Sequence, residues 1–252
     1  MGYATDLTDK QWEMLEPIFS SNKGQHFVEH SKRDLINAVL YLVKAGCQWY
    51  LLPNDFLPYK TVFSFYSRAV QSGKWEKAMD LMVKKVREDA GRKPTPTYGL
   101  IDSQSAKTTL ASDERGFDGG KKVKGRKRHI VVDTMGNLLA ISVHAANIHD
   151  TKSGITPAKK AYEKYSKIQK FCGDDGYRKS FEEDVLEQLG LGVDISKCIK
   201  PKFEVLPLRW LVERTFSWVN HSRRLSRDYE IKTQHQENIF MISHLHTLLK
   251  RY

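Results

Sequence analysis

The residues best suited to chemistry are carboxylates at the ends of two predicted strands and on one predicted helix. Asp102 closes the apolar run "TYGLID", and "KFCGDD" ends in Asp174 and Asp175. Glu213 lies in the helical stretch "LPLRWLVERTFSWVNHSRRLSRDYE". Strand ends in α/β proteins place side chains on a rigid backbone that faces a crevice. A single acid there is usually a turn or capping residue, whereas two in a basic protein indicate a cation site.

The predicted helix around Glu213 has an apolar face and a charged face. Steps of about 100° per residue gather these side chains on the face expected to be core: Leu208, Leu211, Val212, Thr215, Trp218, Val219, Ser222 and Leu225. Glu213 falls on the opposite face. A set of polar and basic side chains lies within about 60° of it around the helix axis: Arg209, Ser217, Asn220, Arg224 and Arg227. Such a carboxylate is commonly a surface ion pair with the arginine four residues before it, worth little energy. The same arrangement also suits a metal-binding acid flanked by phosphate-binding side chains.

Three carboxylates from two strand ends and one helix can hold two divalent ions about 4 Å apart. Hard oxygen ligands favour Mg²⁺ or Mn²⁺ over zinc. One ion activates water or a 3′ hydroxyl, and the other stabilises the leaving oxygen. The chemistry that this arrangement predicts is in-line attack on a phosphodiester.

Other polar residues have simpler explanations. Asp133 precedes the turn "TMGN" and is explained by turn chemistry. Asp150 is explained as a helix cap, with a position near the metal ions as the alternative. The histidine pairs in "HAANIH" and "HLH" do not align on one helix face and have no cysteine partner. We therefore exclude a zinc site.

The overall charge points to nucleic acid. The chain has 252 residues and a formal net charge of +11, with 40% apolar and 28% charged residues. A basic globular protein of this size often binds nucleic acid, because neutralising phosphates releases counterions. No stretch approaches the roughly 18 apolar residues of a membrane span. The three cysteines have no CxxC spacing and fit a reduced cytoplasmic protein.

The positive charge is concentrated in the run "GGKKVKGRKRHIVVD". Six of the eight residues 121–128 are Lys or Arg. Because this run leads into the strand predicted beside the one that carries Asp102, we expect it at the edge of the carboxylate site. The candidate phosphate contacts are Lys121, Lys122, Lys124, Arg126, Lys127 and Arg128. The alternative is a solvated basic loop.

The first region of the chain, residues 1–92, is predicted to be helical. In "TDKQWEMLEPIF", Thr8 and Gln11 have the spacing of a capping box. "SKRDLINAVLYLVKAG" has Ser31 as a cap and Gly46 as a stop. A bent connector and a third helix then follow in the manner of a helix-turn-helix, with four candidate DNA contacts: Lys60, Thr61, Ser64 and Arg68. The alternative is an ordinary helical bundle.

The second region, residues 96–252, is predicted to be a mixed α/β (α+β) layer fold. "GRKPTP" marks the boundary before it. "RHIVVDT" and "LLAISVHAA" flank "MGN" as an antiparallel hairpin. With "TYGLID" they make three strands, followed by helix, strand, helix, a short strand near "GVDISKCIK" and further helices.

These motifs resemble those of bacterial insertion-sequence transposases of the DDE superfamily, close to the insertion sequence 5 family. The matching stretches span nearly the whole chain: "TDLTDKQWEMLEPIF", "AGCQWYLLPNDF", "IDSQSAKTT", "GFDGGKKVKGRKRHIVVDTMGNLL", "GDDGY" and "RWLVERTFSWVNHSRRLSRDYE". The resemblance implies a ribonuclease-H-like core with Asp102, Asp174 and Glu213 as the catalytic, metal-binding triad. The family pattern D-x-G-Y favours Asp174, and Asp175 is the alternative.

The chain departs from the wider family pattern Y-x2-R-x3-E-x6-K at two positions. Arg209 and Glu213 occupy its R and E positions, but Leu206 stands in the Tyr position and Asn220 in the Lys position. Arg223 or Arg224 is then the candidate replacement for the lysine. The predicted DNA contacts of this segment are Arg209, Asn220, Arg223 and Arg224.

The function implied by the resemblance is DNA transposition. We expect binding to the terminal inverted repeats of an insertion sequence, cleavage at its ends, and joining of the 3′ hydroxyl to target DNA with two Mg²⁺ or Mn²⁺ ions. The expected partners are double-stranded DNA and, on DNA, a second copy of the chain, without a membrane. The expected location is the bacterial cytoplasm, at the nucleoid. The alternatives are a metal-dependent nuclease without strand transfer and a catalytically dead DNA-binding descendant.

Overall fold

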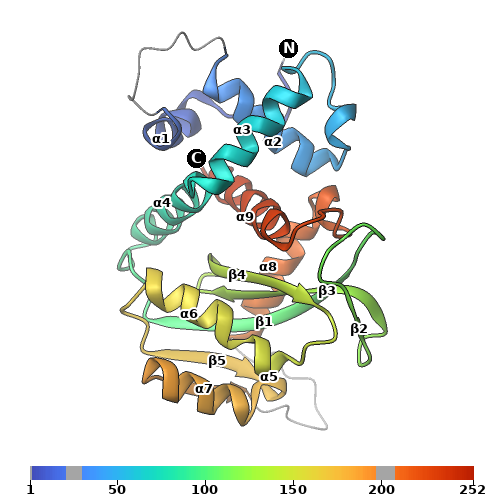
Figure 1. Ribbon diagram of the computed structural model, residues 1–252. Coiled ribbons are helices and arrows are strands. Elements are labelled where there is room, and N and C mark those ends of the chain that lie inside the picture. The colour runs from blue at the N-terminus through green and yellow to red at the C-terminus, as the bar shows by residue number, and fades with distance from the viewer. Residues whose placement is uncertain (1, 21–29, 197–207) are drawn as a thin grey trace. The chain divides into compact units, whose positions relative to one another are not determined.

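The computed structural model describes residues 2–20, 30–196 and 208–252. The chain forms two compact units (Figure 1). The first unit contains residues 1–82, 219–226 and 238–252, and the second contains residues 83–218 and 227–237. The domain boundary expected between residues 92 and 96 stays a prediction. No helix in the described ranges is long and apolar enough to cross a membrane.

The first unit is helical. Its own helices are α1 (Asp9–Phe19), α2 (Lys32–Ala45), the short η1 (Trp49–Leu51), α3 (Tyr59–Gln71) and η3 (Arg223–Leu225). Three further helices contain residues of both units: α4 (Lys74–Asp89), α8 (Arg209–Asn220) and α9 (Thr233–Leu249). Trp75 is fully buried and packs on Phe19, with the ring centroids 4.9 Å apart. On α2 the apolar residues, among them Leu35, Ile36 and Val39, are buried.

The ends of α1 and α2 form as the sequence predicts. The Thr8 hydroxyl accepts from the Gln11 amide at 3.2 Å, and the Gln11 side chain accepts from the Thr8 amide at 3.0 Å, which completes the capping box. Ser31 caps α2, and Gly46 ends it with a φ of 74°. A Cβ at Gly46 would lie 2.8 Å from the Cβ of Arg223. Glycine is therefore needed there both for its conformation and for space.

The second unit is built on one mixed sheet. Its strands are β1 (Tyr98–Lys107), β2 (Gly116–Asp118), β3 (Val123–Val132), β4 (Leu138–Ala145), β5 (Lys170–Asp174) and β6 (Gly192–Ser196). The strand order is β2-β3-β1-β5-β6, and β4 also pairs with β3. The β1, β2, β3 and β4 pairings are antiparallel, whereas β5 is parallel to both β1 and β6. The mixed α/β fold predicted for this region is confirmed.

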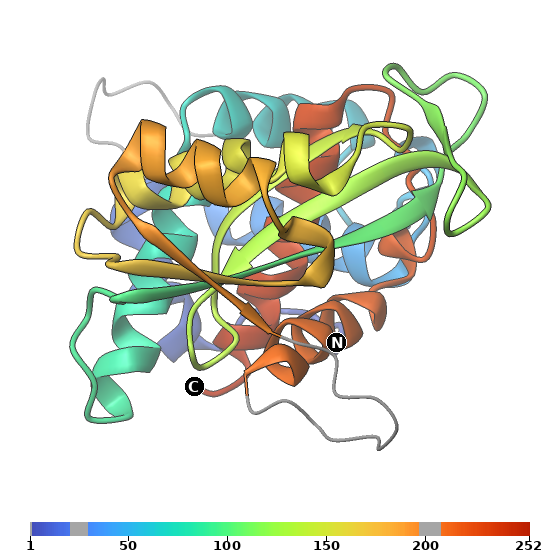
Figure 2. The ribbon, with the colours of Figure 1, turned by 90° about the horizontal axis from the view of Figure 1, so that it is seen from below.

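Helices cover both faces of this sheet. On one face lie α5 (Asp150–Ser153), α6 (Ile155–Lys164) and α7 (Ser180–Leu189), and the first turns of α8 lie on the other (Figures 1 and 2). The Thr215 hydroxyl donates to the Gly136 carbonyl at 2.8 Å, and Arg214 donates to the Met135 carbonyl at 2.8 Å. These bonds to the β3–β4 turn fix α8 so that Val212 is buried and Glu213 faces outward.

Two details of the predicted strands differ from the structure. Asp102 was expected to end its strand, but β1 continues to Lys107 because β3 pairs with it along this whole stretch. The short strand β2 was not predicted, since three residues that begin with Gly116 and are followed by Gly119 carry no strand pattern. On α8, Trp218 is only half-buried, and Phe216 is buried instead. Pro207 suits the first position of a helix and is the sequence signal for the start of this one, but it lies outside the described residues.

Buried histidines predict that the fold loses stability in acid. Burial lowers the pKa of His129 on β3 and of His244 on α9 to about 3, from the usual 6.5. The unfolded chain takes up these protons below pH 6.5, whereas the folded chain does so only near pH 3. The contribution of these histidines to the free energy of unfolding is therefore fully present above their pKa in the unfolded chain. It is lost as the pH falls from that value toward their pKa in the folded chain. Each histidine contributes a slope of up to about 1.4 kcal/mol per pH unit.

Urea unfolding at a series of pH values measures this slope. His244→Leu fills a similar volume and cannot take up a proton, so we expect its stability to fall less steeply below neutral pH than that of the wild type. His221→Gln, at an exposed position, is the control and should keep the wild-type slope. An unchanged slope in His244→Leu would contradict the lowered pKa of His244 as a cause of the loss of stability in acid.

Candidate active site

Asp102 and Asp174 meet because of the register between β1 and β5. Leu100 pairs with Cys172 in the parallel ladder. Each aspartate is two residues further along its strand, and side chains two apart point to the same face. The two carboxylates therefore lie on neighbouring strands and on one face. Both line a pocket together with Leu100, Arg209 and Val212.

Glu213 joins this site through Arg209. The Arg209 Nη2 lies 3.4 Å from Asp174 Oδ2, and its Nε lies 3.3 Å from Glu213 Oε1. Arg209 and Glu213 are four residues apart on α8, the spacing at which helical side chains meet. The structure thus brings Asp102 and Asp174 to one pocket, and Arg209 links Asp174 to the exposed Glu213 beside it.

The electrostatics of the pocket favour a positive charge. Burial raises the pKa of Asp102 to about 6, and the neighbouring Asp174 charge adds to the rise. The Ser103 amide, which donates to Asp102 Oδ1 at 2.7 Å, opposes it, as do Lys121 and Arg209. A half-buried carboxylate beside a second one is stabilised in its charged form when a cation is near.

The donors suit a divalent cation by type, but the complete ligand set is not gathered. Carboxylate oxygens are the ligands that Mg²⁺ and Mn²⁺ prefer. In the described part of the chain, no three His, Cys, Asp or Glu side chains are close enough together to hold one metal ion. Arg209 lies between Asp174 and Glu213 and supplies the positive charge there.

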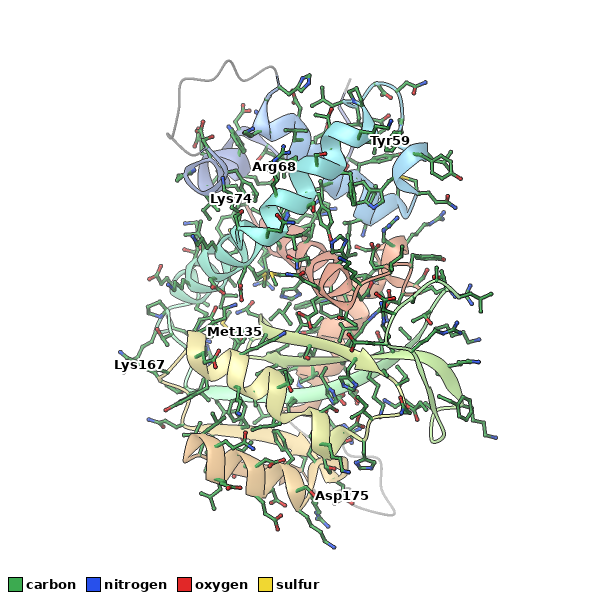
Figure 3. The ribbon with its side chains drawn as sticks, in the orientation of Figure 1. Tyr59, Arg68, Lys74, Met135, Lys167 and Asp175 are labelled. Atoms are coloured by element: carbon green, nitrogen blue, oxygen red, sulfur yellow. The ribbon has the colours of Figure 1, made fainter. Side chains whose placement is uncertain are left out.

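Asp175 is not among the residues that line the pocket. Its carboxylate pairs with Arg178 Nε at 2.6 Å in the short η2 (Asp175–Tyr177), and its side chain is 59% exposed (Figure 3). Asp174 instead lines the pocket and accepts from the Gly176 amide at 2.9 Å. This placement favours Asp174 as the second acid of the site.

The structure divides the basic run into an exposed and a buried part. The exposed residues are Lys121, Lys122 and Lys124. The buried residues, at most 6% exposed, are Arg126, Lys127 and Arg128. The division arises because every residue of β3 from Gly125 onward is buried. Side chains on neither face of the strand therefore reach solvent there. The phosphate contacts predicted for the buried three are therefore not available in this structure.

Arg126 and Arg128 belong to a buried polar network. Arg126 donates to Asp228 Oδ2 at 3.2 Å and to the carbonyls of Asp113 and Glu230 at 2.8 and 2.9 Å. With the Gln236 amide oriented to satisfy its neighbours, its oxygen accepts from Arg128 Nε at 2.9 Å and its nitrogen donates to Asp228. The two arginines thus hold the segment around Asp228 against the sheet.

The remaining predicted DNA contacts are distributed over the helical unit. On α3, Lys60, Ser64 and Arg68 are exposed and Thr61 is half-buried; Figure 3 marks Arg68. Asn220 and Arg223 are exposed. Arg224 was expected beside Glu213, but α8 ends at Asn220, and Arg224 turns inward to donate to the Cys47 carbonyl at 2.7 Å. Leu206 lies outside the described residues.

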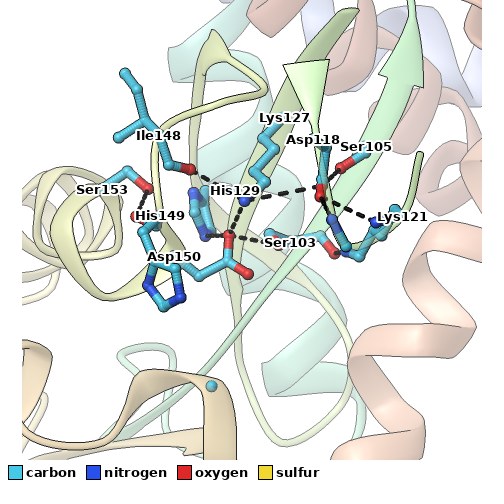
Figure 4. Close-up of polar contacts among 12 residues, drawn as sticks. Ser103, Ser105, Asp118, Lys121, Lys127, His129, Ile148, His149, Asp150 and Ser153 are labelled. Carbon is cyan, nitrogen blue, oxygen red and sulfur yellow. Dashed lines mark hydrogen bonds and ion pairs between the residues drawn. The ribbon is translucent and has the colours of Figure 1, made fainter. Parts of the chain in front are cut away.

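A second polar cluster lies beside Asp102, and it includes Asp150, for which a position near the metal ions was the alternative to a helix cap. Asp150 accepts from Ser103 Oγ at 3.1 Å and pairs with Lys127 at 2.9 Å, and Lys127 also lies 3.8 Å from Asp118 (Figure 4). Asp150 is not the predicted cap, because the His149 side chain caps α5. The turn sequence "DGG", which begins at Asp118, is a local feature that accounts for the bonds Asp118 makes to the turn. Asp133 does form the predicted turn, accepting from the Met135 amide at 2.8 Å.

Two family models match the chain. One, described as "Putative transposase of IS4/5 family", matches residues 7–79. The other, described as "Transposase DDE domain", matches residues 93–248, more than half of the chain. No curated protein gives a significant match.

The buried network predicts that Asp228→Ala strongly destabilises the protein. The substitution leaves Arg126 buried without its carboxylate, which typically costs about 3–5 kcal/mol. Urea unfolding measures this loss. The control is Asp175→Ala at the exposed pair with Arg178, expected to cost less than about 1 kcal/mol. Equal losses in the two variants would show that the Arg126–Asp228 pair is not part of the interior in solution.

Proposed function

The chain belongs to the DDE transposase family, and on this premise we propose that it excises and inserts an insertion sequence. In this proposal it binds the terminal inverted repeats, cleaves the phosphodiester at the element ends and joins the 3′ hydroxyl to target DNA. The observation that carries the proposal is the pocket lined by Asp102, Asp174 and Arg209, where Arg209 also pairs with Glu213.

Members of this family generally use divalent metal ions. The proposed ligands are Asp102, Asp174 and Glu213, and two Mg²⁺ or Mn²⁺ ions would supply activation of the attacking oxygen and stabilisation of the leaving oxygen. Of the chain's own groups, Arg209 is suited to hold the DNA. A guanidinium binds phosphate and carboxylate in the same bidentate manner. A phosphate entering the pocket can therefore take the place of the carboxylates that Arg209 now contacts.

The proposed DNA contacts outside the pocket follow the exposed cations. Lys121, Lys122 and Lys124 lie on or just before β3, next to the strand that carries Asp102. They are suited to the phosphate backbone, which positions DNA without reading its sequence. Recognition of the element ends is assigned to the helical unit, through the exposed face of α3. Because two ends are cut and joined together, we propose a homodimer on DNA.

Glu213→Gln is expected to abolish cleavage while keeping DNA binding. The amide keeps the shape of the side chain but removes the charge, so we expect a loss of about 10²- to 10³-fold or more in the cleavage rate. The assay uses labelled DNA with the element ends, Mg²⁺ or Mn²⁺ and a target plasmid, with EDTA as the metal-free control. Glu187→Gln on the exposed part of α7 is the matched variant and should cleave normally.

The products of this assay separate the alternatives. Wild-type cleavage at the ends followed by joining to the plasmid supports the transposase. Cleavage without joining favours the nuclease. Tight binding without cleavage by the wild type would overturn the catalytic proposal and leave a DNA-binding protein.

Neutralising two exposed lysines is expected to flatten the salt dependence of DNA binding. With Lys122→Ala and Lys124→Ala together, the slope of log K against log salt should fall by about 1.8, because each phosphate contact contributes about 0.9. The loss of affinity should be similar for end and unrelated sequences. The charge-matched control replaces the exposed Lys84 and Lys167. A slope equal to that of the control would exclude these phosphate contacts.

A further inference from the structure

A buried carboxylate organises the turn that carries the exposed lysines. Asp118, the last residue of β2, is only 8% exposed. Its Oδ1 accepts from the amides of Gly120 and Lys121, both at 3.0 Å, and its Oδ2 accepts from Ser105 Oγ at 2.6 Å (Figure 4). Asp118 therefore ties the turn after β2 to the strand that also carries Asp102.

This turn directs the Lys121 side chain to the candidate active site. Lys121 Nζ donates to the carbonyl of Ser103 at 3.1 Å, and Ser103 directly follows Asp102. The positive charge of Lys121 is also close enough to oppose the rise in the pKa of Asp102. An ammonium has three donors, so a bond to one carbonyl leaves capacity for phosphate oxygens.

The position of the ammonium is fixed from two sides. Asp118 holds the backbone of Lys121, while the Ser103 hydroxyl is held by Asp150, which pairs with Lys127. The next residue, Lys122, has a φ of 53°. A non-glycine residue in the left-handed region persists only where its surroundings impose it, commonly at functional sites.

We propose that Lys121 is a catalytic residue whose ammonium binds a non-bridging oxygen of the scissile phosphate, and that Asp118 is the positioning residue that holds it there. The inference rests on the proposed DNA cleavage and adds to it two specific roles. Lys121 stabilises the charge that develops on the phosphate as the attacking oxygen approaches. Asp118 acts only through Lys121.

Lys121→Ala tests the catalytic role. We expect the cleavage rate at saturating DNA to fall by about 10- to 100-fold, the range for a hydrogen bond to a charged group. The matched control is Lys167→Ala, which removes the same charge from an exposed position and should cleave at the wild-type rate. Circular dichroism and thermal melting confirm that each variant is folded.

A metal-free binding measurement tests the contact itself. Wild-type cleavage first identifies the scissile phosphate, which is then replaced by an uncharged methylphosphonate in end DNA. In EDTA, we expect this change to weaken wild-type binding by several-fold and to leave the binding of Lys121→Ala nearly unchanged. An equal effect in both proteins would place Lys121 away from this phosphate and overturn the inference.

A double variant tests whether Asp118 acts through Lys121. Asp118→Ala should lose most of the activity that Lys121→Ala loses, and the double variant should be no slower than Lys121→Ala alone. Asp118→Asn should retain more activity, because its amide oxygen can still accept from both turn amides. The alternative outcome is that Asp118→Ala slows Lys121→Ala by the same factor by which it slows the wild type. Asp118 would then have a purely structural role, and its assignment as the positioning residue of Lys121 would be overturned.

The failure of this inference differs from the failure of the proposed function. If the wild type cleaves end DNA, Glu213→Gln does not, and Lys121→Ala cleaves normally, only the inference is overturned. If the wild type does not cleave at all, the proposed function falls and the inference falls with it.

Discussion

The candidate site depends on a change of pairing along β1. From Leu100 to Lys107 this strand is bonded to β3 in antiparallel fashion, but only Tyr98 to Leu100 are bonded to the parallel β5. Beyond Leu100, the β5 side of the strand has lost its ladder partner, and a crevice opens where parallel strands end. Asp102 and Asp174 lie at this point on adjacent strands. Strand register, rather than any loop, therefore sets their separation.

This placement concentrates negative charge, and the surrounding elements compensate for it. Arg209 reaches the site from α8, and Lys121 reaches it from the turn after β2. Both cations are held by the fold: Arg209 by its spacing from Glu213, and Lys121 by the buried Asp118. The positive charge is thus held in place by the fold; in the proposed function, charge preorganised in this way would stabilise a transition state better than mobile charge.

Local sequence signals predicted the local structure well. The Thr8 capping box, the Ser31 cap and the Gly46 stop depend on neighbours within a few residues, and all three form. The order of strands and helices from β3 to β6 also follows the sequence pattern. The extent of β1 was not predictable, because it depends on where β3 continues to pair. The prediction of Asp102, Asp174 and Glu213 as a triad came from the family resemblance, since an acid on a helix is most often a surface residue, and it stays a prediction.

The basic run illustrates what a sequence pattern leaves open. The sequence does not distinguish the six cations among residues 121–128 from one another. In the fold, their different burial gives them different physical roles. Arg126 has its carboxylate partner in Asp228, about a hundred residues away in the chain, so no local pattern can reveal that pairing. The buried cations pay for their desolvation with ion pairs and hydrogen bonds inside the fold, and in doing so they anchor the strand from which Lys121, Lys122 and Lys124 extend. The buried half of the run thus fixes β3 in the interior, and of the exposed half Lys121 is the lysine whose ammonium is held beside Asp102, through the Ser103 carbonyl.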